Sequence, residues 1–464
     1  MQAGTSDRRW PWLLAAIMVL GLALRIAGAQ GGLSLDEAWS SVQARDAGTP
    51  LGIFLNINHD NNHHLNSLWL LLVGFDAPPL LQRALSIASS TLAILVVACL
   101  GRRRGAALGL LTALLFAVSP VLVTLGSEAR GYAPMSLALL TALLLIDRWL
   151  AGESRDSPAL SLALCFFIGA LFQLTILFGL CAVAGWVFFT LRRRDGFGRA
   201  ARATLRLFLP TAIGVGLVFA IIAYGALTHQ GFHFGSYDRF EFMWFLRGLT
   251  EMYGYTLGLP GMPLPLLALV PALLVLLPGT GVSRLPLHRL AILGFPIALA
   301  VLQAGNVGHP RYYLLCGLSL LILLAEMLWL EIRGGGWRRW VAAAAGIVIL
   351  AGSIGCDIDL AINRRGDSLA TISALKARAP QGARILLDGT IGRAVLESAA
   401  ASAHYPIAIV QAECPPPRFL YFFRFRGEAR TPRLVHCGRR YAEIAGMQAR
   451  GFSGTPWTLY ELQP

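Results

Sequence analysis

Residues 31–64 read GGLSLDEAWSSVQARDAGTPLGIFLNINHDNNHH, and this polar stretch separates the first long apolar run of the chain from the second. It carries the adjacent carboxylates of Asp36 and Glu37, and it ends in a cluster of histidine, asparagine and aspartate. Polar groups gathered beside membrane-spanning sequence are costly unless water or a ligand satisfies them. We therefore expect this stretch to be a loop at a membrane surface with a function of its own.

The composition of the chain is that of a membrane protein. Of its 464 residues, 56% are hydrophobic and only 14% are charged, and the mean hydropathy is +0.61. Soluble domains contain about 25% charged residues. We therefore expect an α-helical polytopic membrane protein rather than a soluble one.

Apolar runs that can cross a bilayer, which takes about 17–25 residues, recur about 11 times. Their expected positions are 11–28, 80–100, 105–124, 132–150, 158–173, 174–191, 204–226, 261–278, 287–304, 312–331 and 339–356. The first run follows Arg8 and Arg9, and no clear cleavage motif of small residues comes after it. We expect it to remain as an uncleaved transmembrane helix. The neighbouring runs on either side of residues 173–175 require a tight turn there.

The orientation of the chain follows from its arginines. The formal net charge is +14, and Lys376 is the only lysine. Most arginines stand in short clusters between apolar runs, which the positive-inside rule explains better than nucleic-acid binding. We place these clusters in the cytoplasm and predict a multi-pass protein of the inner (plasma) membrane. The regions expected outside are the long loop 29–79, the junctions 125–131 and 305–311, the loop 227–260 and the C-terminal region.

The C-terminal region differs in composition, because long apolar runs stop after residue 356. We expect a transmembrane domain over 1–356 and a small extracytoplasmic α/β domain over 357–464. The expected helices of the small domain are 367–378, 392–403 and 440–450, and its expected strands are 384–387, 407–410, 420–425 and 458–462. The sequence leaves open whether Cys414 and Cys437 pair as a disulfide or remain free thiols.

Three segments outside the apolar runs are predicted to be amphipathic. Residues 36–48 and 64–75 are too short to span the bilayer, and we expect helices that lie along the membrane surface. The loop 227–260 is rich in aromatic residues. We expect it to cover a site, although an aromatic belt at a membrane interface has the same composition.

Asp36 and Glu37 are the first candidates for chemistry. A carboxylate at this place can act as a general base, as a metal ligand or as the electrostatic partner of a developing cation. The alternative is structural, because acidic residues are favoured in the first turn of a helix and Ser34 or Asp36 is a suitable N-cap. Spacing alone does not decide between these roles.

The second candidate group is the HDNNHH sequence that ends the quoted stretch. On a helix, His59 and His63 would share a face and could bind one metal ion, with Asp36 as a further ligand. Asp60 and His64 have the same spacing. The alternative is a hydrated turn, because asparagine and aspartate favour turns and cap the helix that follows.

Two more groups lie at expected outer junctions of the spans, SEARGY at 127–132 and HPRYY at 309–313. Arginine at such a place can hold a phosphate with two hydrogen bonds, and tyrosine can supply a hydroxyl or stack on a sugar ring. The alternative is anchoring at the membrane interface, where both residue types are common. Glu128 and Arg130 could also neutralise each other.

Motifs for nucleotides are absent from the sequence. The chain has no GxxxxGK[ST] loop and no GxGxxG segment after a predicted strand, so we predict no nucleotide cofactor. The cofactor that the sequence leaves open is a divalent metal ion.

The order of these motifs resembles the multi-spanning GT-C glycosyltransferases. A first span is followed by LDEAW at 35–39, by HDNNHHLN at 59–66, by a span that ends in arginines and by EARGYA at 128–133. The chain looks closest to the bacterial branch grouped with dolichyl-phosphate-mannose protein mannosyltransferases and the aminoarabinose transferase of lipid A (families 39 and 83). It has HHLN at 63–66 where the family often has H-P-P-L or K-P-P-L. The resemblance covers the first half of the chain and the HPRYY junction.

The resemblance implies a hexosyl- or pentosyltransferase that moves a sugar from a polyprenyl-phosphate donor to a lipid, polysaccharide or protein acceptor on the outer face of the membrane. Asp36 would be the catalytic carboxylate, supported by Glu37. The residues that would bind the donor phosphate are Arg130, Tyr132, Arg311 and Tyr312. The residues that would contact the substrates are His59, Asp60, His63, His64 and Glu128.

Two other functions fit the composition. The first is a transporter or flippase for a lipid-linked saccharide, but transporters usually place charges at the membrane midplane and show repeated halves. Here the charges gather at the outer boundary and no repeat is visible, which favours the enzyme. The second is a non-catalytic envelope scaffold, in which the C-terminal domain would be the working part.

Overall fold

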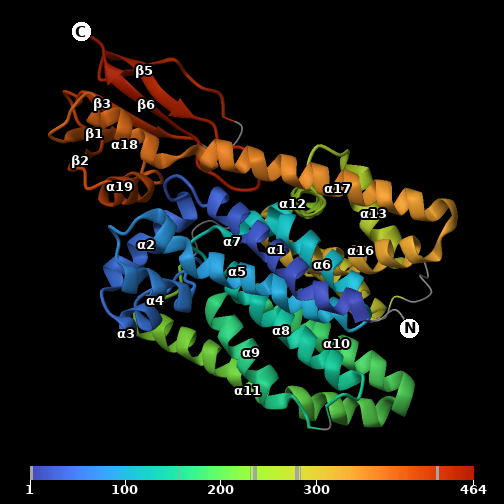
Figure 1. The fold of residues 1–464 in the computed structure, drawn as a ribbon. Helices are drawn as coiled ribbons and strands as arrows, with labels where there is room; N and C mark the ends of the chain where they lie inside the picture. The colour runs from blue at the N-terminus through green and yellow to red at the C-terminus, as the bar shows by residue number, and fades with distance from the viewer. Residues whose placement is uncertain are drawn as a thin grey trace.

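The structure is a computed structural model that describes residues 4–154, 156–229, 231–233, 238–276, 282, 284–424 and 428–464, without the side chains of residues 4–7. Parts of the expected span 261–278, loop 227–260 and strand 420–425 therefore lie outside the described residues. A bundle of helices forms most of the molecule, and a small domain with a β-sheet lies at one end of it (Figure 1). The N-terminus lies at the other end. The predicted fold class, a helical membrane protein with a small C-terminal α/β domain, is confirmed.

All the expected spans are helical where the structure describes them. The helices are α1 (Gly4–Gly28), α5 (Pro79–Arg102), α6 (Ala106–Val118), α7 (Pro120–Gly126), α8 (Tyr132–Leu150), α9 (Ala159–Phe172), α10 (Ile176–Asp195), α11 (Phe197–Thr228), α13 (Leu264–Leu276), α14 (Leu285–Arg289), α15 (Phe295–Val301), α16 (Leu314–Gly334) and α17 (Gly336–Asn363). A π-helical turn, Leu290–Gly294, joins α14 to α15. The ends of α9 and α10 confirm the tight turn predicted near residues 173–175.

The apolar helices fall into two groups by length. In the described part of the chain, 7 helices are long and apolar enough, or 8 if α6 and α7, which meet at 61°, form one span. The helices α9 and α13 and the α14–α15 segment are shorter. The 8 spans and these 3 shorter segments correspond to the 11 apolar runs expected from the sequence, and α13 ends where the described residues end. The bend between α6 and α7 falls at Pro120, which cannot donate the backbone hydrogen bond that would continue α6.

The arginine clusters meet at one end of the bundle. The carboxylate of Asp147 in α8 pairs with Arg103 after α5 at 2.6 Å and with Arg284 before α14 at 2.9 Å. Arg102 stacks on Trp10 in α1, with 4.2 Å between the guanidinium carbon and the ring centroid. These clusters therefore share the end of the bundle where α1 begins, away from the C-terminal domain (Figure 1).

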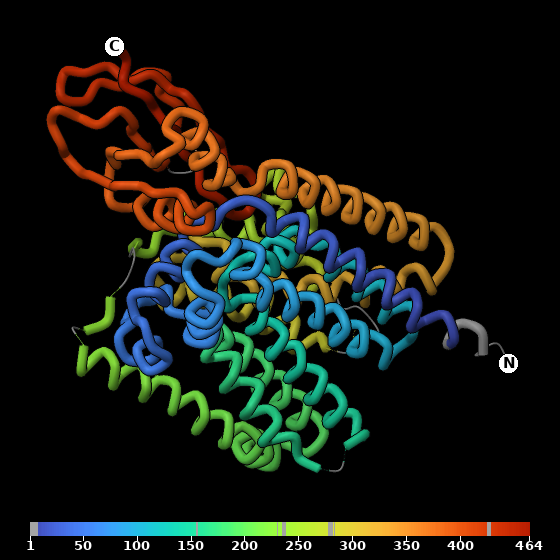
Figure 2. The backbone as a smooth tube through the Cα atoms, turned by 60° about the vertical axis from the view of Figure 1, so that its left-hand side comes forward, coloured from blue at the N-terminus to red at the C-terminus, as the bar shows by residue number. Residues whose placement is uncertain are grey.

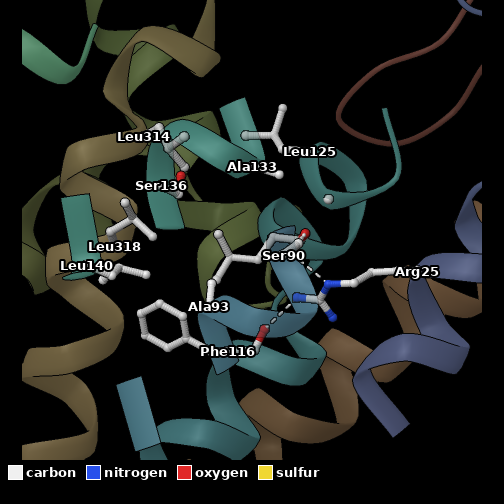
Figure 3. A pocket seen from close by; sticks show the side chains of 12 residues that line it. Arg25, Ser90, Ala93, Phe116, Leu125, Ala133, Ser136, Leu140, Leu314 and Leu318 are labelled. Atoms are coloured by element: carbon white, nitrogen blue, oxygen red, sulfur yellow. Dashed lines mark hydrogen bonds between the residues drawn. The ribbon is translucent and has the colours of Figure 1, made fainter. Parts of the chain in front are cut away.

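Arg25 is a buried charge inside the bundle. It is 1% exposed and lies at a small cavity between α1, α5, α6, α7, α8 and α16 (Figure 3). Its guanidinium donates to the hydroxyl of Ser90 at 2.7 Å and to the carbonyls of Phe116 and Ala117 at 3.2 and 3.0 Å. Buried charges are tolerated when hydrogen bonds satisfy them, so these bonds make Arg25 a structural link between α1, α5 and α6.

The first loop folds into three short helices, which are α2 (Leu35–Ala47), α3 (Pro50–Leu55) and α4 (His64–Val73). Two of them confirm the helices predicted at 36–48 and 64–75. The third is started by the hydroxyl of Thr49, which accepts from the backbone N–H of Gly52 at 3.0 Å. Helix α19 (Arg393–Ser402) of the C-terminal domain packs against α2 (Figure 2). The loop is thus held between the bundle and the C-terminal domain.

The C-terminal domain packs α18 (Ser368–Lys376) and α19 against a six-stranded sheet. Its strands are β1 (Ala383–Leu387), β2 (Ile407–Val410), β3 (Phe419–Phe423), β4 (Arg433–His436), β5 (Arg439–Met447) and β6 (Trp457–Leu462). Their order is β2-β1-β3-β6-β5-β4, with β2, β1 and β3 parallel and the other neighbours antiparallel. The core includes Ile385, Leu396 and Trp457. Because α17 continues past residue 356 to Asn363, the sheet domain begins later than the expected boundary.

One predicted element of this domain is wrong. Residues 440–450, expected to be helical, contribute to β5, which pairs with β4 across a two-residue turn at Cys437 and Gly438. Both turn residues have positive φ, 50° and 71°, as tight hairpins require, and the hairpin commits the following residues to a strand. Cys437 also forms a disulfide with Cys414, which decides between the two alternatives that the sequence leaves open.

Candidate functional site

Asp36 lies in the first turn of α2, at the end of the bundle that carries the C-terminal domain. The chain reaches it through Gly31, which has a φ of 86°. The backbone N–H of Ser34 donates to the Glu37 carboxylate at 2.8 Å, as in a capping box. Glu37 therefore has the structural role that the sequence leaves open, which is to stabilise the first turn of the helix. Asp36 has different partners.

The carboxylate of Asp36 joins two arginines that are far apart in the sequence. Its Oδ2 accepts from Nη1 of Arg130 at 2.6 Å and also pairs with Nη1 of Arg311. Arg130 lies in the turn between α7 and α8, and Arg311 lies in the short 3-10 helix before α16. The side chains of Asp36, Arg311 and Arg130 are 35%, 29% and 6% exposed. The structure thus brings three of the predicted site residues together, and solvent reaches the carboxylate and one of its cations.

Arg130 is held by groups from several elements. Its Nη2 donates to Oδ1 of Asn61 at 2.6 Å, and its Nε and Nη2 lie 3.3 and 3.1 Å from Nε2 of His63. Nδ1 of His63 lies 2.8 Å from the carbonyl oxygen of Phe172, so Nδ1 carries the proton and Nε2 accepts from Arg130. The guanidinium carbon lies 5.2 Å from the ring centroid of Tyr132, within cation–π range. These contacts fix the direction of the guanidinium.

The charges of the site decide its protonation state. Burial alone would raise the pKa of Asp36, but Arg311 and Arg130 outweigh it and hold that pKa well below its usual range. Burial, with the charge of Arg130 beside it, lowers the pKa of His63 to about 3. Burial and the charge of Arg311 also lower the pKa of His309. At neutral pH the site therefore holds one ionised carboxylate, two guanidinium groups and neutral imidazoles.

Glu37 lies behind Asp36 and has a different environment. Its Oε1 and Oε2 accept from Nε and Nη2 of Arg83 at 2.8 and 2.7 Å, and both side chains are 0% exposed. The backbone N–H of Ala129 donates to the same carboxylate at 2.7 Å. Arg83 also donates to three backbone carbonyls of the loop 29–32. This network ties the loop before Asp36 to α5 and to the turn between α7 and α8.

The histidine cluster divides between the surface and the interior. His59 and Asp60 pair with each other, with 2.8 Å between Nδ1 and Oδ1, and both are about one quarter exposed. His64 is buried, and its ring stacks on Phe54 with 5.3 Å between the centroids. Burial lowers the pKa of His64 to about 4. Of the histidines in the cluster, His63 makes the direct contact with Arg130.

Glu128 and Tyr312 lie near the group formed by Asp36, Arg130 and Arg311, but each has other partners. Glu128 is 3% exposed, and its Oε1 accepts from the hydroxyl of Ser453 in the C-terminal domain at 2.6 Å. Arg130 pairs with Asp36, so the mutual neutralisation of Glu128 and Arg130 is not the arrangement observed. Tyr312 is half-buried, with its ring centroid 6.1 Å from that of His309.

The predicted metal ligands Asp36, His59 and His63 are not brought together. Among the described residues, one group of three His, Cys, Asp or Glu side chains has its ligand atoms within 4.8 Å of one another, and it consists of Cys414, His436 and Cys437. Its two cysteines form the disulfide, which removes them as thiolate ligands. In the predicted set, both nitrogens of His63 have partners and Asp36 faces two cations. These residues do not fit a divalent ion.

The described part of the loop 227–260 lies over the histidine end of the site. The backbone N–H of His233 donates to the carbonyl of Asn58 at 2.7 Å, and the N–H of Asp60 donates to the carbonyl of His233 at 3.1 Å. Further along, α12 (Phe242–Thr256) packs against the 3-10 helix before α16. The described residues of this loop therefore contact the histidine cluster and the 3-10 helix that carries Arg311.

Arg83, Asn61 and Arg365 belong to the site but are not assigned from the sequence. Arg83 had a signal, because a lone arginine within an expected span is costly without a partner. Asn61 stands in the histidine cluster without a role of its own. Arg365 is 2% exposed, and its partners are the distant carbonyls of Thr124 and Ser127, both at 2.9 Å, so no local pattern marks it.

Comparisons with known proteins give matches only among solved structures. No family model matches the chain, and no curated protein matches it. ArnT from Cupriavidus metallidurans, bound to undecaprenyl phosphate, is 14% identical with a TM-score of 0.47, over 97% of this chain and 98% of that one. The oligosaccharyltransferase of Archaeoglobus fulgidus, in complex with Zn and sulfate, is 14% identical with a TM-score of 0.46, over 85% of this chain and 62% of that one.

Proposed function

We propose that the chain is a membrane glycosyltransferase that moves a sugar from a polyprenyl-phosphate donor to an acceptor on the outer face of the membrane. The observation that carries the proposal is the one-third exposed carboxylate of Asp36, held between the guanidinium groups of Arg130 and Arg311. It lies at the end of the bundle opposite the arginine clusters, which is the outer end if those clusters are cytoplasmic.

The two arginines suit the leaving group of this reaction. In the transfer, the bond between the anomeric carbon of the sugar and the phosphate oxygen breaks, and the polyprenyl phosphate leaves with an additional negative charge. A guanidinium group can donate two hydrogen bonds to the oxygens of one phosphate, and its charge stabilises the negative charge that develops on that phosphate. Arg130 is already oriented by Asn61 and His63, so little reorganisation is needed when the donor binds.

Asp36 suits the acceptor side of the reaction. The acceptor nucleophile bonds to the anomeric carbon, and its proton passes to the Asp36 carboxylate as general base. With both arginines beside it, the carboxylate is a weak base, because its pKa is held well below the usual range. A donor phosphate that takes over the arginine contacts would raise that pKa, so donor binding would activate the base.

Glu37 has a supporting part in this proposal. Its carboxylate is fully buried against Arg83, which leaves it no contact with a substrate, and we assign it to positioning Asp36 and the α7–α8 turn. The predicted substrate contacts of His59 and Asp60 remain part of the proposal, and so do the predicted contacts of Tyr132 and Tyr312 with the donor phosphate.

The test is sugar transfer by the purified full chain in lipid nanodiscs. We would supply a panel of undecaprenyl-phosphate hexoses and pentoses, whose carrier lipid is the one in the ArnT structure, together with lipid, oligosaccharide and peptide acceptors, and measure the release of undecaprenyl phosphate. The matched pair of variants is Asp36→Asn and Asp46→Asn, since both residues lie in α2 and the side chain of Asp46 is 60% exposed. We expect release by the wild type and by Asp46→Asn and loss of release in Asp36→Asn. Undiminished release of undecaprenyl phosphate by Asp36→Asn would show that Asp36 is not the general base.

A further inference from the structure

The turn that joins α17 to α18 has a strained backbone. Arg364, Arg365 and Asp367 have φ values of 49°, 56° and 33°, and Gly366 between them has 89°. Residues other than glycine rarely adopt left-handed φ, and such a run persists only where surrounding contacts over-determine it. We therefore ask which contacts hold the backbone of this turn in its left-handed conformation, and which neighbouring segments they join.

Arg365 is the side chain that the turn inserts beneath the site. Its guanidinium donates to the carbonyls of Thr124 and Ser127 at 2.9 Å each and to the hydroxyl of Ser127 at 2.5 Å. Its Nη1 also lies 3.9 Å from Oε2 of Glu37. Arg365 thus lies beside Glu37 in α2 and is bonded to the end of α7 and to Ser127, the residue that follows it.

Neighbouring groups of the C-terminal domain hold the loop that leads to Asp36. Oδ1 of Asp367 accepts from the backbone N–H of Gly32 at 3.1 Å, and the hydroxyl of Thr455 accepts from the N–H of Leu35 at 2.9 Å. On the other side of the site, Ser453 donates to Glu128 at 2.6 Å. The small domain is therefore bonded to both chain segments that carry the reactive side chains.

We propose that Arg365 is a positioning residue through which the C-terminal domain sets the spacing between Asp36 and Arg130. The inference rests on the proposed function. Asp36 and Arg130 belong to different segments, and Arg365 bonds to one of these segments and lies beside the other, so a change at Arg365 shifts one reactive group relative to the other. Small displacements of reacting groups reduce rates strongly even when binding is retained.

The test compares Arg365→Lys with Arg364→Lys in the full chain in nanodiscs. Both substitutions keep the positive charge and require the same left-handed backbone, but the side chain of Arg364 is 54% exposed and that of Arg365 is 1% exposed. The first measurement is hydrogen–deuterium exchange of the peptides that cover 31–38 and 124–131. The second is kcat and KM for the undecaprenyl-phosphate sugar that the wild type uses.

For Arg365→Lys we expect faster exchange in both peptides, a loss of kcat of about tenfold to hundredfold and an unchanged KM. We expect wild-type values for Arg364→Lys. Exchange rates and a kcat equal to those of the wild type in Arg365→Lys would overturn the proposal. A lower unfolding temperature together with a lower kcat and a higher KM would also overturn it, because that pattern indicates a general loss of structure.

A second variant keeps the proposal testable if Arg365→Lys does not fold. Ser453→Ala removes one hydroxyl from a half-buried position, and we expect a few-fold loss of kcat at unchanged KM; an unchanged kcat would count against the proposal. A wild type that releases no undecaprenyl phosphate would sink the proposed function alone, because the exchange measurement uses no donor and still decides the positioning role.

Discussion

Glu37 and Arg83 form a buried ion pair beneath the candidate site, with both carboxylate oxygens bonded to the guanidinium at 2.8 and 2.7 Å. The neighbouring carboxylate of Asp36 is 35% exposed. Two adjacent acidic residues thus have opposite environments, since one is fixed inside the protein and the other faces the site. The roles that we assign to them follow from this difference.

Replacing Glu37 should destabilise the fold. Glu37→Gln leaves the Arg83 guanidinium buried without its counter-charge, and breaking one side of a buried pair costs about 3–5 kcal/mol. We expect a clearly lower unfolding temperature of the purified protein in detergent. Asp46→Asn, at an exposed position of the same helix, is the control and should unfold like the wild type. An unfolding temperature of Glu37→Gln equal to that of the control would show that the pair does not stabilise the fold.

Acid should weaken the protein through the same pair. Burial alone would raise the pKa of Glu37, but Arg83 holds it below its ordinary value of 4.5. A carboxyl group with a lowered pKa in the folded state stabilises the fold above that ordinary value, and this contribution is lost as the pH falls below it. We expect the unfolding temperature to fall steeply below about pH 4.5 in the wild type and less steeply in Glu37→Gln. Parallel curves for the two proteins would contradict this.

Arg130 should contribute directly to donor binding. Its guanidinium is oriented towards Asp36, and a charge-assisted hydrogen bond is worth about 1.5–3 kcal/mol. We therefore expect Arg130→Ala to bind undecaprenyl phosphate about tenfold to a hundredfold more weakly in a titration with the nanodisc-embedded protein. Arg45→Ala serves as the control, because Arg45 is 40% exposed and pairs with Asp46 at the other end of α2. Equal affinities of the two variants would remove Arg130 from the donor site.

The topology can be tested by thiol labelling of intact cells. We propose that α2 and the C-terminal domain lie outside and that the arginine clusters lie in the cytoplasm. Single cysteines at exposed positions, introduced as Asp46→Cys and Arg378→Cys, should react with an impermeant maleimide, whereas Arg193→Cys should react only after permeabilisation. The reverse pattern would place the site on the cytoplasmic side and contradict the proposed reaction.

The sequence predicted those features that depend on local composition. The helical structure of the apolar runs follows from their length, and the tight turn at 173–175 follows from the break between two of them. The structure confirms both predictions. The 11 expected runs correspond to helical segments, but a run of apolar residues does not show that the helix bends between α6 and α7 at Pro120. Residues 440–450 were misread because the tight turn at Cys437 and Gly438, and not the periodicity of the segment, makes it a strand.

The candidate site was predictable only in part. Asp36, Arg130 and Arg311 stand in recognisable motifs at span junctions, and the structure brings them together. The separation of roles between Asp36 and Glu37 depends on Arg83, which lies in another helix. Arg365 enters the site through a left-handed turn after the last span. The sequence marks Arg83 only as a lone arginine within an expected span, and it marks Arg365 by no local pattern, so the partners of these two side chains are visible only in the structure.

The central claim is that the donor phosphate binds between Arg130 and Arg311. The most direct measurement is a cryo-electron microscopy map of the full chain in nanodiscs with undecaprenyl phosphate. We predict density for the phosphate within hydrogen-bonding distance of both guanidinium groups, with Asp36 no longer paired to at least one of them. Phosphate density at the arginine clusters at the opposite end of the bundle, with the Asp36 contacts intact, would contradict the account.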